Sequence, residues 1–159
     1  MTSDSPLMQQ PLDALLAWYS SLQADTVKLA EQFYAAEARF KDPFNDVQGV
    51  ANVAAIFQHM FATTQQPRFI INERILQHQQ AFVTWTFEFE LQGRAYQIVG
   101  GSHLVFNAAG LVILHRDYWD AAEELLQKLP IVGVPIRWLR KKFALPDLPD
   151  LPNLPQTQP

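Results

Sequence analysis

The spacing of apolar residues along the chain changes once, near residue 67. Before this point apolar residues recur every three or four positions, which is the spacing of one helix face. We predict a first helix from about residue 12, a second from Asp25, which is a good capping residue, and a third after Gly49. Asp42-Pro43 ends the helical pattern, because proline pushes the preceding residue towards extended geometry. The apolar positions are Leu12, Leu15, Leu16 and Tyr19, then Val27, Ala30, Phe33 and Tyr34, then Val53, Ile56, Phe57, Met60 and Phe61.

After residue 67 polar and apolar residues alternate, which is the pattern of half-buried strands. Between residues 83 and 91 every second side chain is Thr or Glu and the others are large and mostly aromatic. Gln92-Gly93 and the stretch 107–110 predict turns. The expected strands are 68–79, 83–91, 96–106 and 111–119. Helices followed by strands indicate an α+β fold in which the helices cover one face of a curved antiparallel sheet.

Composition narrows the class of protein. The 159 residues fit one domain, and 48% hydrophobic residues with 12% aromatic residues can build a sizeable core. A net charge of -4 argues against general nucleic-acid binding, and the absence of cysteine excludes disulfides and thiolate metal sites. Residues 1–10 lack the features of a secretory signal, and no apolar run reaches the roughly 18 residues of a membrane span. We therefore expect a cytoplasmic protein.

Four segments differ in character. Residues 1–10 are expected to be a flexible N-terminus, and residues 11–129 form the domain. Asp120, followed by Glu123 three positions later, predicts a short capped helix before Pro130. Residues 130–144 form a basic amphipathic segment. In 145–159, proline at every third position favours polyproline II.

The basic segment carries four cationic residues beside apolar ones: Arg137, Arg140, Lys141 and Lys142. Such a segment can lie on an anionic membrane surface, each cation adding about 1 kcal/mol. The alternative is a C-terminal helix that packs on the domain or on a second copy of the chain. Trp138 falls on the polar side, which weakens the amphipathic pattern and favours the second interpretation.

Residues 33–44 resemble the NTF2-like superfamily, and within it the SnoaL-like and ketosteroid-isomerase-like proteins. The shared pattern is an aromatic residue and Tyr, an alanine-rich stretch, and a strand that ends in Asp-Pro, here Phe33-Tyr34 to Asp42-Pro43. Gly49 and the strand ending in Tyr118-Trp119 also fit. The resemblance implies a cone in which the sheet wraps the helices around an apolar pocket. It also implies a homodimer, a small hydrophobic ligand and no cofactor.

The resemblance also suggests roles for single residues. In the isomerases the Asp of Asp-Pro is the general base, and Asp42 matches it. The two donors that stabilise the dienolate are not kept, because Trp18 stands where the family has Tyr and Ser102 where it has Asp. Indole and a plain hydroxyl are poorer donors for this purpose. The departure argues against ketosteroid isomerisation itself.

The last strand carries the strongest candidate chemistry. His115, Asp117 and Trp119 share a face with Ile113 behind them, and the resemblance turns this face into the cone. SnoaL-like cyclases place an acid and a His there for ring closure driven by proton transfer, so we expect Asp42, Asp117 and His115 to be catalytic. The expected pocket-lining residues are Trp18, Tyr19, Phe57, Trp85, Phe87, Phe89, Ile98, Ser102, Leu104 and Trp119.

Each candidate also has a structural interpretation. Asp42 can serve only the turn at Pro43, His115 can be a satisfied core histidine, and Asp117 can pair with an arginine. A metal site is not expected, because His115 and Asp117 offer two ligands where zinc takes three or four. Two functions therefore remain open. One is an isomerase, cyclase or hydratase acting on a steroid-, polyketide- or fatty-acyl-like molecule, and the other is a non-catalytic module for ligand binding or dimerisation.

Overall fold

The computed structural model of the protein describes residues 6–126. The periodicity predicted the run of long strands that follows residue 64, but it did not predict the two strands, 34–41 and 46–48, that lie between the helices. The elements are α1 (Pro6–Ser20), the 3-10 helix η1 (Val27–Gln32), β1 (Tyr34–Lys41), β2 (Asp46–Gln48), α2 (Val50–Thr63), β3 (Gln65–Gln77), β4 (Gln80–Leu91), β5 (Arg94–Phe106), β6 (Val112–Tyr118) and α3 (Ala121–Glu124).

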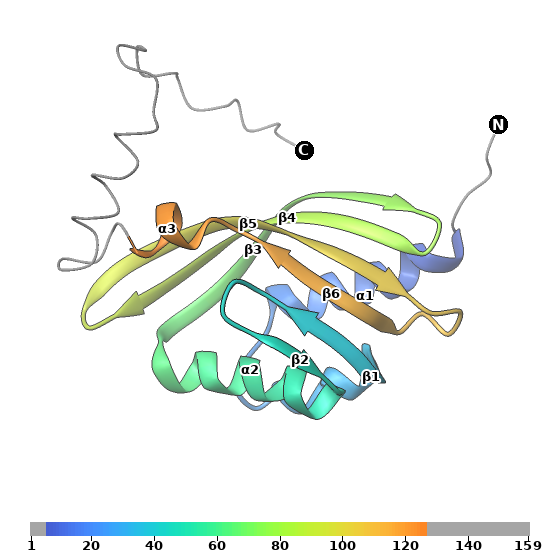
Figure 1. Ribbon diagram of the computed structural model, residues 1–159, viewed down its shortest axis with the longest axis horizontal. Coiled ribbons are helices and arrows are strands. Elements are labelled where there is room, and N and C mark those ends of the chain that lie inside the picture. Colours follow the sequence, from blue (N-terminus) through green and yellow to red (C-terminus); the bar gives the residue numbers. More distant parts are fainter. Residues whose placement is uncertain (1–5, 127–159) are drawn as a thin grey trace, which may run out of the picture.

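The six strands form one curved sheet in the order β2-β1-β6-β5-β4-β3 (Figure 1). The strands from β3 to β6 form an antiparallel meander, whereas β1 and β6 run parallel. The expected sheet was wholly antiparallel. The difference arises because β1 leads into β2 and α2 rather than into a hairpin with β6, so no tight turn fixes their relative direction. The α+β architecture itself is confirmed.

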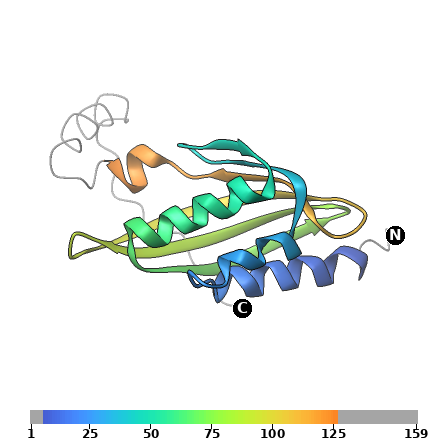
Figure 2. The same cartoon turned by 90° about the horizontal axis from the view of Figure 1, so that it is seen from below.

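Both long helices lie against one face of the sheet (Figure 2). The predicted apolar stripe of α1 is buried, and Val53 and Phe57 of α2 complete the same core. Gly49 precedes α2 with a φ of 96°, in the left-handed region that favours glycine. Within residues 6–126, no helix is long and apolar enough to cross a bilayer.

The second predicted helix is shorter than its apolar pattern suggested. Only Val27–Gln32 is helical, as a 3-10 helix, and Tyr34 already begins β1. Alanine-rich 35–38 favours a helix by propensity. The backbone here instead pairs with β6, and Tyr34, Ala35, Ala38 and Phe40 become buried, so tertiary packing overrides local preference.

Helix α1 begins earlier in the chain than predicted, whereas the capped helix α3 lies where it was predicted. Helix α1 begins at Pro6, inside the segment 1–10 that was expected to be flexible, and Met8 packs into the core. At the other end Asp120 caps α3, as predicted, by accepting hydrogen bonds from the backbone N–H groups of Ala122 and Glu123. The basic segment 130–144 and the proline-rich 145–159 lie outside the described residues.

Two consecutive glycines in β5 make room for large rings. Gly100 pairs with Trp85, and a Cβ atom on Gly100 would lie 2.6 Å from Cη2 of that tryptophan. A Cβ atom on Gly101 would lie 2.7 Å from Cζ of Phe82. The β4–β5 pairing continues without a register shift, so these glycines mark close packing of rings rather than a bulge.

We predict that Gly100→Ala destabilises the protein by about 1–3 kcal/mol, because the new methyl group overpacks the site beside Trp85. Urea unfolding measures the effect. Val99→Ala is the matched control, because this neighbouring side chain is 51% exposed and its loss is expected to cost about 0.5 kcal/mol or less. Equal unfolding midpoints for Gly100→Ala and the wild type would contradict the packing argument.

Candidate active site

One extra residue in β6 sets which side chains face the interior. The pairing of β5 with β6 shifts register between Val105 and Phe106, so Ile113 is a bulged residue. Ile113 is 36% exposed, whereas Val112 and His115 are buried. The expectation that Ile113 lies behind His115 on the inner face was therefore wrong. The expectation that His115 and Asp117 turn inward agrees with their hydrogen bonds to buried groups.

The cross-strand register brings the polar residues together. Ser102 of β5 lies directly opposite Asp117, and Leu104 lies directly opposite His115. Trp85 of β4 is a diagonal neighbour of Ser102, because Ser102 pairs with Val83. Opposed side chains on one face of a sheet lie within contact distance, so the pairing alone groups a carboxylate, an imidazole and a hydroxyl.

The carboxylate of Asp117 receives two hydrogen bonds on Oδ1. Ser102 Oγ donates at 2.5 Å, and His115 Nε2 lies 2.7 Å away. Both lengths are typical of hydrogen bonds to an ionised carboxylate. In the described part of the chain no hydrogen bond to Asp117 ends on Oδ2. The side chain of Asp117 is 16% exposed, whereas that of His115 is 4% exposed.

Two tyrosines hold the other ring nitrogen of His115. The hydroxyl of Tyr34, from the start of β1, lies 2.7 Å from Nδ1, and the hydroxyl of Tyr19, from α1, lies 3.0 Å from it. The two hydroxyls also hydrogen-bond to each other. Burial raises the pKa of Tyr19 well above its usual value, with Tyr34 and Asp117 adding to the effect, and burial likewise raises the pKa of Tyr34. Both phenols therefore stay protonated and able to donate.

The donors and acceptors fix the direction of this network. The indole N–H of Trp85 can only donate, and it does so to Ser102 Oγ at 2.8 Å. Ser102 then directs its own proton to Asp117. His115 donates from Nε2 to the same carboxylate, which leaves Nδ1 as the acceptor for the tyrosines. No buried side-chain nitrogen or oxygen atom in residues 8–126 lacks a partner.

A small chamber borders this network. Its volume is about 30 Å³, which is room for one or two water molecules. Five of its lining residues carry polar groups and the other six present only apolar carbon. The lining residues are Leu16, Tyr19, Phe57, Phe69, Ile71, Val83, Trp85, Ser102, Leu104, His115 and Asp117.

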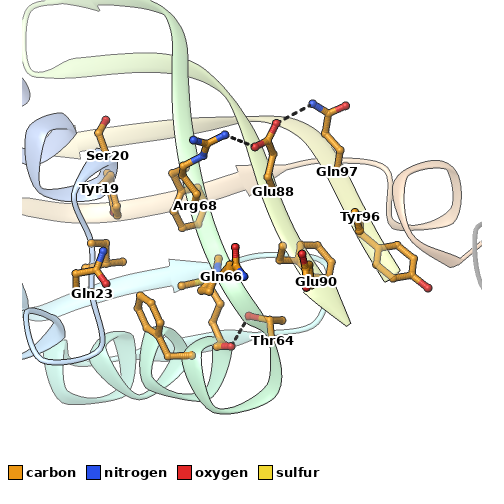
Figure 3. Close-up of a pocket in the computed structure, with 17 residues that line it drawn as sticks. Tyr19, Ser20, Gln23, Thr64, Gln66, Arg68, Glu88, Glu90, Tyr96 and Gln97 are labelled. Carbon is orange, nitrogen blue, oxygen red and sulfur yellow. Dashed lines mark hydrogen bonds and ion pairs between the residues drawn. The ribbon is translucent and has the colours of Figure 1, made fainter. Parts of the chain in front are cut away.

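A much larger open hollow of about 980 Å³ lies next to the chamber, between the ends of α1 and α2, the start of β3 and the β4–β5 hairpin (Figure 3). It shares Tyr19 and Phe69 with the chamber. Ring contacts continue from the chamber into the hollow, since Phe69 stacks on Phe87, Phe87 on Phe89, and Phe89 on Tyr96. An aromatic wall thus leads from the chamber to the hairpin.

Asp42 lies apart from the chamber, in the turn between β1 and β2. Its Oδ1 accepts hydrogen bonds from the backbone N–H groups of Phe44 at 2.7 Å and Asn45 at 2.6 Å, and the side-chain amide of Asn45 donates to both carboxylate oxygens. This is the turn geometry that Asp favours before proline. Asp42 and Asp117 both border an open hollow of about 610 Å³ on the outer side. The two carboxylates therefore share that surface, while only Asp117 also lines the chamber.

Residues 15–115 match the family model of the SnoaL-like domain, which covers more than half of the chain. The chain belongs to the SnoaL-like family. Among curated proteins, none matches the sequence.

Solved structures agree with this fold. An LEH-like epoxide hydrolase from M. tuberculosis is 15% identical, with a TM-score of 0.67 over 89% of this chain and 100% of its own. A Jannaschia protein provisionally assigned as a SnoaL-like polyketide cyclase is 12% identical, with a TM-score of 0.67 over 77% and 94%. A Catenulispora acidiphila protein of ketosteroid isomerase-like fold, in complex with trimethylamine, is 12% identical, with a TM-score of 0.65 over 82% and 98%. At these identities the likeness shows the fold alone.

The SnoaL-like domain brings half of the expected pocket residues to the chamber. Five of the ten line it, namely Tyr19, Phe57, Trp85, Ser102 and Leu104. Phe89 lines the hollow, and Trp119 borders the outer surface near Asp42. Phe87 and Ile98 line neither the chamber nor the hollow. Trp18 points away, since its indole N–H donates to the carbonyl of Thr26 at 3.1 Å and its ring stacks on Phe33.

Sequence reasoning missed five residues of this SnoaL-like site, namely Tyr34 and the chamber-lining Leu16, Phe69, Ile71 and Val83. Tyr34 was placed on a helix, which hid its approach to His115, although it belongs to the family pattern that was recognised. Phe69 lies on a strand whose mixed character gave no clear inner face. Tyr19, rather than its neighbour Trp18, supplies the hydroxyl from the first helix. Within residues 6–126, no group of three or more potential metal ligands is found.

The raised pKa of each buried tyrosine predicts a loss of stability in alkali. An unfolded tyrosine ionises near pH 10, whereas Tyr19 and Tyr34 ionise at higher pH when folded, so stability is full below about 10 and declines above it. Each group contributes a slope of about 1.4 kcal/mol per pH unit. Tyr34→Phe should therefore show a shallower decline than the wild type in urea unfolding between about pH 10 and 11.5. Parallel declines would show that Tyr34 titrates normally.

Proposed function

We propose that this SnoaL-like protein binds a small hydrophobic molecule and that Asp117, supported by His115, transfers a proton on it. The observation that carries the proposal is the position of the pair. A carboxylate and an imidazole lie 2.7 Å apart at the polar end of an otherwise apolar chamber. Such a carboxylate is suited to general acid–base catalysis, because little water competes for it.

The proposed step uses the two oxygens of Asp117 differently. Oδ1 is held by Ser102 and His115, so it fixes the orientation of the carboxylate. Oδ2 is the atom proposed to take a proton from a substrate carbon. The electron pair of that C–H bond then moves to a neighbouring carbonyl oxygen, to which Tyr19 donates by turning its O–H away from Tyr34, while Tyr34 keeps its hydrogen bond to His115 Nδ1. Returning the proton to another carbon completes an isomerisation with no co-reactant. In a ring closure the carbon that lost the proton instead forms a bond to a second carbonyl carbon of the same molecule, the π bond of that carbonyl breaks, and the proton goes from Asp117 to the resulting alkoxide oxygen.

The lining of the hollow is mixed, with Arg68, Glu88 and Glu90 among its polar residues, and it is the rings in this lining that support an apolar ligand. Phe61, Phe89 and Tyr96 line it together with Phe69, so a flat or extended hydrocarbon skeleton would cover their rings. Its volume of about 980 Å³ falls at the upper end of ordinary ligand sites. A steroid, a polyketide or a fatty-acyl chain is the size we propose, with its reactive end directed towards the chamber.

We propose a subsidiary role for Asp42. Its carboxylate already accepts hydrogen bonds from the β1–β2 turn, so it is less available as a base than Asp117. It borders the same outer hollow as Asp117, where it can affect exchange of the transferred proton with solvent. Substituting it should therefore reduce turnover less than substituting Asp117 does.

A second candidate is a non-catalytic ligand carrier. The observation in its favour is that the buried network satisfies its own polar atoms, as a purely structural cluster would. The chamber of about 30 Å³ also admits no substrate group larger than water without movement of a side chain. The carrier predicts ligand binding with no turnover in any variant.

Two expectations about partners stay predictions. The homodimer expected from the family has support in apolar side chains on the outer sheet face, among them Ile75 and Val99, which are exposed. Membrane association through Arg137, Arg140, Lys141 and Lys142 concerns residues outside the described part of the chain. Neither expectation is needed for the proton-transfer proposal.

Asp117→Asn tests the proposed base. The assay follows a nitrobenzisoxazole, an apolar aromatic compound that loses a carbon-bound proton to a base and opens to a coloured phenolate. We expect turnover to fall by about 100-fold or more, because the amide cannot accept the proton, while ligand affinity changes little. Native mass spectrometry of the purified protein identifies any retained ligand for a second assay.

Two further variants act as controls. Asp46→Asn removes an exposed carboxylate that pairs with Arg39 and lines neither the chamber nor the outer hollow, and it should leave turnover unchanged. Asp42→Asn should reduce turnover less than Asp117→Asn does. If Asp42→Asn abolished turnover and Asp117→Asn did not, the base would be misassigned. If the wild type bound the compound without turning it over, the carrier function would be favoured.

A further inference from the structure

Only two side chains, Tyr19 and Phe69, border both the chamber and the hollow in the described part of the chain. They form the wall between the space that is large enough for a ligand and the space that contains Asp117. Any group larger than water that reaches Asp117 from the hollow must therefore displace one of them. The size of the group that enters the chamber therefore depends on which of these two side chains can move.

Tyr19 is fixed by its polar contacts. Its hydroxyl hydrogen-bonds to Tyr34 and lies 3.0 Å from His115 Nδ1. Moving this side chain would leave buried polar atoms without partners, which is expensive in an apolar interior. Tyr19 thus behaves as the static part of the wall.

The side chain of Phe69 has no polar group and is held by apolar packing, in which ring contacts take part. Its ring centroid lies 6.0 Å from that of Trp85, 6.1 Å from that of Tyr19 and 4.6 Å from that of Phe87. Displacing Phe69 therefore breaks no hydrogen bond. A ligand ring that took its place would pack against the same neighbouring rings, which offsets the cost of moving the side chain.

The backbone before Phe69 is also irregular. Strand β3 lies at one end of the strand order and pairs with β4 alone. Its register shifts between Gln65 and Arg68, Gln66 has a φ of 49°, and Pro67 has no N–H to donate. A strand start with these features constrains the side chain that follows it less than a central strand would.

We infer that Phe69 is the specificity-determining residue that sets how large a group reaches Asp117 from the hollow. This inference rests on the proposed function, because it takes the hollow as the ligand site and the chamber as the reaction site. It goes further in assigning selection by size to one movable ring. Its test needs no knowledge of the natural substrate.

The experiment measures access of benzene to the chamber. Phe69→Ala removes one phenyl ring from the wall, so the space it leaves fits a benzene molecule. Benzene is titrated while the indole N–H signal of Trp85, assigned by its loss in Trp85→Phe, is followed by NMR. We expect this signal to shift in Phe69→Ala at benzene concentrations at least about tenfold lower than in the wild type, as for other engineered apolar cavities.

Phe87→Ala is the matched control. It removes an identical ring that stacks on Phe69, but Phe87 borders neither the chamber nor the hollow. Benzene should leave the Trp85 signal of this variant as it is in the wild type. An equal response in Phe87→Ala, or no response in Phe69→Ala, would overturn the inference. If Phe69→Ala fails to fold, Phe69→Leu should give an intermediate response, and no response in that variant overturns the inference as well.

Turnover separates this inference from the proposed function. If the protein is catalytic, Phe69→Ala should raise kcat/KM for a bulky nitrobenzisoxazole relative to a small one, and Phe87→Ala should leave this ratio unchanged. A benzene response in Phe69→Ala without turnover in any variant would remove the catalytic function but keep Phe69 as the gate. If turnover is lost in Asp117→Asn but Phe69→Ala shows no benzene response, the catalytic function is kept and Phe69 is not the gate.

Discussion

The hydrogen bond between His115 and Asp117, partly buried on the inner face of the sheet, is the interaction on which the site depends. A carboxylate in an apolar interior needs donors, and here Ser102 and His115 supply them to one oxygen. The imidazole in turn needs a donor for its second nitrogen, which the tyrosines provide. The chemistry of one strand therefore requires partners from β1, β5 and α1, and the fold brings these elements together.

The sequence predicted most of the helices and strands, but it did not predict where they depart from local preference or regular pairing. Alternation and turn residues predicted the four long strands, and the apolar stripe predicted α1, because these signals are local. The parallel pairing of β1 with β6 and the strand conformation of Tyr34 depend on contacts between distant residues. The bulge at Ile113 is a single-residue shift that no periodicity reveals, yet it determines which side chains of β6 face inward.

The same distinction applies to the site. Asp117 and His115 could be found because a carboxylate and an imidazole alternating on one strand face are uncommon in an apolar setting. Tyr34 and Phe69 could not, because their roles arise from a helix, a strand edge and a cavity that meet only in three dimensions. Asp42 illustrates the opposite case. A family pattern marked it as a base, while its contacts are those of a turn residue.

The ring nitrogens of His115 provide the most direct measurement of the proposed network. Nitrogen NMR at neutral pH distinguishes the two tautomers of a histidine by the nitrogen that carries the proton. We predict a proton on Nε2, donated to Asp117, and a bare Nδ1 that accepts from the tyrosines. A proton on Nδ1 with none on Nε2 would contradict this assignment, because His115 could then not donate a hydrogen bond to Asp117.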